Sequence, residues 1–93
     1  MERVTKHLKI FGHVQGVGYR AWAVQNATQI GLRGWVRNRS NGSVEAVVTG
    51  DEDAVQKFIS ACYEGPRASK VETISVSDGL DELLSSFEQR ETS

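Results

Sequence analysis

In the stretch HLKIFGHVQGVGYRAWAVQNATQI, residues 7–30, the spacing of the apolar side chains changes once. Up to Val14 the spacing is two, with Leu8 and Ile10 on the same face, which is typical of a strand. From Tyr19 onward the spacing is close to four, as in a helix. That helical stripe consists of Tyr19, Ala23, Ala27 and Ile30. We therefore predict a strand over 7–14, a glycine-containing loop over 15–18 and a helix that begins at Tyr19.

The rest of the chain continues with short elements separated by turn residues. Gly31 is placed to end the first helix in a left-handed conformation, Asn41-Gly42 indicates a hairpin turn, and Gly65-Pro66 ends the second helix. The predicted elements are a strand over 33–39, a strand over 43–49, a helix over 51–63 and a strand over 71–76. After Ser77 the pattern weakens and fits either a short last strand or an irregular tail.

The order strand, helix, two strands, helix, strand predicts an α+β fold of the ferredoxin-like βαββαβ type. Right-handed crossovers would place both helices on one face of an antiparallel sheet. The other face would meet water, which suits the polar alternate positions of the strands. Those positions include His13, Arg37, Arg39 and Glu45.

Composition narrows the class of protein. The chain has 93 residues, a net charge of -1 and 39% hydrophobic residues, which favours one folded domain over residues 1–93. Cys62 is the single cysteine, and no apolar run approaches a membrane span. We expect a cytoplasmic monomer with no membrane partner. A nucleic-acid partner is not expected either, because nucleic-acid binding needs a basic surface. An RNA-recognition sheet would also need more exposed aromatic residues than Phe11.

The loop at residues 15–18 is the segment best suited to chemistry. The first N–H groups of the helix that follows lack partners within it and carry partial positive charge. Gly16 and Gly18 allow the backbone to approach a ligand closely, and Arg20 adds a planar fork of donors in the first turn. Together these groups form a cradle for an anion such as phosphate. A plain glycine turn beside a surface arginine is the simpler alternative.

Three segments resemble the acylphosphatase family: GHVQGVGYR (residues 12–20, preceded by Ile10), GWVRN (residues 34–38, followed by Gly42, Val44 and Gly50) and GPRASKV (residues 65–71). The resemblance covers roughly residues 7–76. It implies a ferredoxin-like fold and a hydrolase that cleaves the carboxyl–phosphate bond of acyl phosphates without metal or cofactor. The site residues that it implies are Gln15, Gly16, Val17, Gly18, Tyr19 and Arg20 for the phosphate, with Arg20 as the phosphoryl-binding arginine and Asn38 orienting the attacking water.

The sequence departs from the family pattern at two places. Tyr19 stands where the family usually has phenylalanine, so its hydroxyl needs a hydrogen-bond partner if the ring is buried. The end of the chain, Phe87-Glu88-Gln89-Arg90, is more polar than the family's usual last strand.

Other roles for the reactive side chains are weaker. His13 could act as a phosphohistidine nucleophile, but strand alternation turns it away from the face of Val14. Cys62 falls in an apolar helical stripe and is expected in the core. Arg37 and Arg39 could steer an anionic substrate from the solvent face. A phosphate-binding relative without catalytic activity is the remaining alternative to an enzyme.

Overall fold

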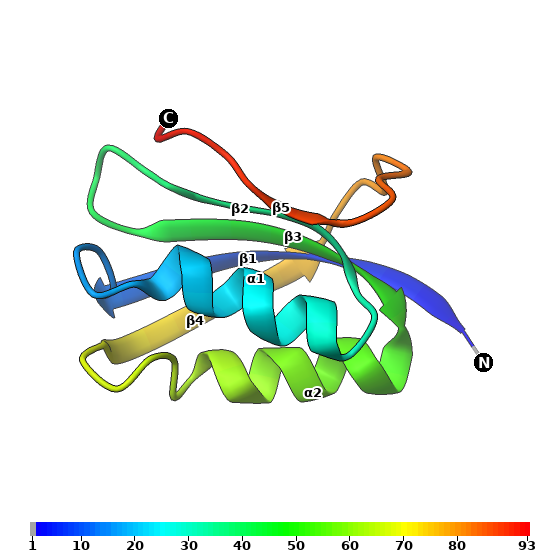
Figure 1. Ribbon diagram of the computed structural model, residues 1–93, viewed down its shortest axis with the longest axis horizontal. Coiled ribbons are helices and arrows are strands. Elements are labelled where there is room, and N and C mark those ends of the chain that lie inside the picture. Colours follow the sequence, from blue (N-terminus) through cyan, green and yellow to red (C-terminus); the bar gives the residue numbers. More distant parts are fainter. Residues whose placement is uncertain (1) are drawn as a thin grey trace.

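Two helices and five strands follow one another along residues 2–93, the part of the chain that this computed structural model describes (Figure 1). The elements are β1 (Arg3–His13), α1 (Tyr19–Gln29), β2 (Arg33–Asn38), β3 (Val44–Asp51), α2 (Glu52–Cys62), β4 (Lys70–Asp78) and β5 (Phe87–Gln89). The βαββαβ order is confirmed. The first strand begins four residues earlier than expected, because its polar start still pairs with β3 as far as Asp51.

The strands form one sheet in the order β4-β1-β3-β2-β5. The first four strands pair antiparallel, as expected. The sequence left a fifth strand open, and β5 extends the edge of this sheet by running parallel to β2. Between β4 and β5, residues 79–86 cross from one edge of the sheet to the other, so that the chain enters β5 in the direction of β2. The polar end of the chain therefore does form a last strand, of only 3 residues.

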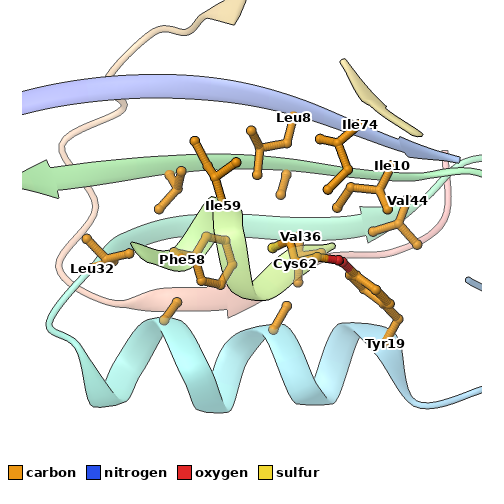
Figure 2. Packing of buried hydrophobic residues seen from close by; sticks show 14 of the residues in the cluster. Leu8, Ile10, Tyr19, Leu32, Val36, Val44, Phe58, Ile59, Cys62 and Ile74 are labelled. Carbon is orange, nitrogen blue, oxygen red and sulfur yellow. The ribbon is translucent and has the colours of Figure 1, made fainter. Parts of the chain in front are cut away.

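Both helices cover the same face of the sheet, as predicted (Figure 1). The core lies between them and the inward side chains of the strands, such as Leu8, Ile10 and Val36 (Figure 2). In α1 the stripe Tyr19, Ala23, Ala27 is buried. Alternation in the strands and a helical stripe in α1 thus meet in one apolar layer, which is the reason these segments pack together.

The outer face of the sheet is not simply solvated, and this expectation is wrong at its centre. Glu45 is only 8% exposed, and Trp35 and Val47 are also buried. Residues 79–86 pass over this face, and Glu82 accepts a hydrogen bond of 2.8 Å from the indole Nε1 of Trp35. A segment with no regular structure of its own therefore covers Trp35 and Val47, whereas Glu45 is enclosed by its hydrogen-bond partners.

The hairpin between β2 and β3 closes at residues 39–43. The Arg39 N–H donates to the Ser43 carbonyl at 2.8 Å, and the Gly42 N–H donates to the Arg39 carbonyl at 3.1 Å. Gly42 has a φ of 94°, a conformation that glycine adopts without strain. The hairpin and the loop between β1 and α1 lie at the same end of the molecule (Figure 1). Within residues 2–93, no helix has the length and apolar character needed to cross a membrane.

Candidate active site

The loop between β1 and α1 turns on two glycines. Val14, just after the strand, is buried and anchors the loop to the core. Gly16 and Gly18 have φ values of 73° and 79°, a region in which a residue with a Cβ is strained. Gly18 is also the residue that precedes the first turn of α1. The sequence therefore builds a tight strand-to-helix turn at the position where the spacing of apolar residues changes.

This loop leaves its backbone N–H groups free. The first hydrogen bond of α1 runs from the N–H of Trp22 to the Gly18 carbonyl, at 3.0 Å. Within the described chain, residues 2–93, the N–H groups of Gln15 through Arg20 have no acceptor. Such unpaired donors at a helix N-terminus form a ready site for an anion.

A cavity of about 150 Å³ lies in front of these donors. Its lining consists of Val14, Gln15, Gly16, Gly18, Tyr19, Arg20, Ala21, Asn38 and Gln89. Arg20 comes from the first turn of α1, and Asn38 comes from the last position of β2. No acidic side chain of residues 2–93 pairs with the Arg20 guanidinium. The cavity thus joins the unpaired Arg20 guanidinium and backbone donors with the neutral side-chain amides of Asn38 and Gln89.

The remaining predicted site residues divide by where their side chains lie. Val17 packs against the core instead of lining the cavity. The side-chain amide of Gln15 donates to the carbonyls of Arg39 and Ser43, each at 2.8 Å. At both positions the side chain is engaged elsewhere, while the backbone N–H has no acceptor within residues 2–93.

Tyr19 is buried, and its hydroxyl has the partner that the sequence required. It donates to the carbonyl of Cys62, the last residue of α2, at 2.6 Å (Figure 2). Burial raises the pKa of the Tyr19 hydroxyl far above its usual range, so it stays protonated. The hydroxyl therefore fastens the start of α1 to the end of α2.

The competing residues are placed away from the cavity. His13 is exposed and does not line it. Cys62 is buried in the core, where loss of hydration raises the pKa of its thiol to about 12, although the neighbouring Tyr19 partly opposes the shift. A thiol held in this state is a poor nucleophile. Across residues 2–93, no three His, Cys, Asp or Glu side chains gather as a metal site.

Gln89 lines the cavity but was not among the residues expected there. It lies in β5, the segment that sequence pattern left open between a strand and a tail. Only the parallel pairing of Val36 with Gln89 places it beside the end of β2. No sequence signal pointed to it.

Comparison with known proteins identifies the family to which the chain belongs. The family model for acylphosphatase matches residues 6–89. The chain belongs to the acylphosphatase family. An acylphosphatase of Rhizorhabdus wittichii is 44% identical over 91 residues, which is 98% of this chain and 92% of the relative.

Two solved acylphosphatase structures share the fold closely. That of Coxiella burnetii has a TM-score of 0.90 at 32% identity, covering 95% of this chain and 93% of that one. That of Bacillus subtilis has a TM-score of 0.90 at 36% identity, covering 94% and 98%. The resemblance read from the loop and from the GWVRN segment is thus confirmed at the level of the family and of the fold.

Proposed function

We propose that the cavity beside α1 is the site where this acylphosphatase-family enzyme hydrolyses acyl phosphates to a carboxylate and phosphate. The backbone N–H groups of Gln15, Gly16, Val17, Gly18, Tyr19 and Arg20 hold the phosphoryl oxygens together with the Arg20 guanidinium. Asn38 orients the attacking water. The observation that carries this proposal is the single cavity that joins the unpaired Arg20 and the free loop N–H groups with Asn38.

The donors suit the charge that develops in the reaction. Phosphoryl transfer passes through a loose transition state with charge on the equatorial oxygens. Fixed donors aimed at these oxygens stabilise that charge without reorganising. The leaving carboxylate is weakly basic and departs unprotonated, so the site needs no general acid. Arg20 and the loop supply the positive field that the step requires.

Asn38 suits the role of positioning water. Its side-chain amide offers both donors and an acceptor but takes up no proton at neutral pH. It can therefore align a water molecule without activating it as a base. The proton passes to the substrate phosphate or to solvent. Asn38 comes from β2, so in this proposal the water and the phosphoryl group are held by different elements.

Asn38→Ala tests this division between binding and chemistry. With benzoyl phosphate as substrate, we expect kcat to fall about 100-fold, roughly 3 kcal/mol, on loss of one positioning contact. Competitive inhibition by inorganic phosphate should stay nearly unchanged. Asn41→Ala is the matched control, since the Asn41 Oδ1 accepts hydrogen bonds from Ser43 within the same hairpin. The control should lower the thermal midpoint and keep kcat.

A near-normal kcat in Asn38→Ala would remove Asn38 from the mechanism. Absence of benzoyl phosphate hydrolysis by the unmodified protein would remove the proposed activity as a whole.

We also propose that residues 1–93 act as a single cytoplasmic domain, as a monomer and without a nucleic-acid or membrane partner. The net charge of -1 supports the absence of a nucleic-acid partner, because it gives no basic field for a polyanion.

A further inference from the structure

The side chain of Gln15 connects two segments that are far apart in the sequence. Its Nε2 donates to the carbonyl of Arg39 and to the carbonyl of Ser43, each at 2.8 Å. Both N–H bonds of the amide are thereby used, and both reach the hairpin between β2 and β3. Gln15 itself belongs to the loop between β1 and α1.

The hairpin does not need these two bonds to close. The Ser43 carbonyl already accepts from the Arg39 N–H at 2.8 Å, and the Arg39 carbonyl already accepts from the Gly42 N–H at 3.1 Å. Removal of the Gln15 amide therefore leaves neither carbonyl without a partner. The two bonds from Gln15 instead hold the loop between β1 and α1 at a fixed distance from the hairpin.

We propose that Gln15 is a positioning residue that sets the phosphate loop in register with Asn38. This inference rests on the proposed function of the cavity. We call the two hydrogen bonds from the Gln15 side chain to the hairpin the strut. Asn38 directly precedes Arg39, so the strut ends one residue from the side-chain amide that is proposed to orient the water. The groups that hold phosphate all belong to residues 15–20, whereas Asn38 belongs to β2. The strut thus links the two halves of the site.

This arrangement predicts a split between binding and turnover. The proposed phosphate donors all lie within residues 15–20, so phosphate binding should survive a small shift of this loop relative to β2. The same shift would change the distance and angle between the bound phosphate and the water oriented by Asn38. A displacement on the order of 1 Å between reacting groups can cost up to about 100-fold in rate.

Gln15→Met tests the strut, because methionine has similar length and no donor. With benzoyl phosphate, we expect kcat to fall about 30-fold and inhibition by inorganic phosphate to change less than about 3-fold. Gln25→Met, the same change on the exposed side of α1, is the control and should match the unmodified protein. Gln15→Asn should not restore the rate, because its shorter side chain cannot reach both carbonyls.

A double-mutant cycle separates positioning from mere loss of stability. If Gln15 acts through Asn38, then Gln15→Met should lower kcat less than about 3-fold in the Asn38→Ala background, since the two losses do not add. An equal 30-fold loss in both backgrounds would overturn the proposal. So would a loss of phosphate inhibition as large as the loss of kcat.

The strut can also be judged without turnover. In Gln15→Met, amide hydrogen exchange measured by NMR should accelerate in residues 39–43 and leave α2 unchanged. Unchanged exchange in the hairpin would overturn the strut even if the enzyme is active. Conversely, faster exchange in a protein that does not hydrolyse benzoyl phosphate would support the strut and reject the proposed function, so the two failures are distinguishable.

Discussion

The Arg20 guanidinium enters the cavity from the first turn of α1 and has no acidic partner within residues 2–93. Arg20→Lys keeps the charge but removes the planar fork that we propose to bind two phosphate oxygens at once. We expect kcat/KM to fall about 100-fold and phosphate inhibition to weaken. The thermal midpoint should change little, because no ion pair is lost. Steady-state kinetics and thermal unfolding on one preparation check this.

Arg67→Lys is the matched control for that substitution, since Arg67 is exposed and lies outside the cavity. Its kinetics should equal those of the unmodified protein. Undiminished phosphate inhibition in Arg20→Lys would place the phosphate site elsewhere.

The hydroxyl of Tyr19 contributes to the stability of the fold. Tyr19→Phe keeps the ring and removes the donor to the buried Cys62 carbonyl. We expect the free energy of unfolding to fall by about 1–2 kcal/mol, the cost of a buried acceptor left unpaired. Urea unfolding measures this. Tyr63→Phe, at a 52% exposed position, should cost much less. Equal effects of the two substitutions would contradict the role assigned to the hydroxyl.

At the scale of elements, Glu45 on β3 ties together the outer face of three strands. Its carboxylate bonds with His7 of β1 at 2.6 Å, Arg37 of β2 at 2.8 Å and Arg39 of the hairpin at 2.9 Å. Burial by itself raises the pKa of Glu45, but the hydrogen bonds from Arg37, His7 and Arg39 outweigh it. They hold the pKa at about 2, below the ordinary 4.5.

This lowered pKa predicts how stability depends on pH. A carboxyl whose pKa is lower in the folded state stabilises the protein above its unfolded pKa, and that stabilisation is lost as pH falls toward the folded pKa. Glu45→Gln should therefore lower the free energy of unfolding by about 2 kcal/mol at pH 7. The difference from the unmodified protein should shrink between pH 4.5 and pH 2. Denaturant unfolding across this range measures it.

Glu72→Gln, an exposed change on β4, is the control and should show little dependence on pH. A Glu45→Gln effect of the same size at pH 7 and pH 2.5 would show that packing, and not the charge, is what the substitution removes.

At the scale of the whole molecule, the fold itself supplies the positive charge of the proposed site, through the free backbone N–H groups of the loop and through Arg20. We therefore expect hydrolysis of benzoyl phosphate to continue unchanged after exhaustive treatment with a chelator. Activity is measured before and after treatment, with magnesium and zinc added back separately. A loss that either metal restores would contradict the proposed mechanism.

The sequence alone determined the order of the elements and the position of the glycine loop that we propose to bind phosphate. Both depend on local rules: apolar spacing separates β1 from α1, and Gly16 and Gly18 permit a turn that other residues resist. The resemblance in residues 12–20 and 34–38 added Arg20 and Asn38. The need of the Tyr19 hydroxyl for a partner also followed from its chemistry, although the partner itself did not.

The tertiary structure decided what depends on residues far apart in the chain. Gln89 reaches the cavity only because β5 pairs parallel to β2, and the two carbonyls bound by Gln15 lie more than twenty residues away from it. Glu45 is buried because residues from the two neighbouring strands and from the hairpin surround it. A pattern of polar and apolar residues indicates which side of a strand faces the core. It does not indicate which distant segment will cover the other side, because that depends on packing and hydrogen bonds formed only when the whole chain has folded.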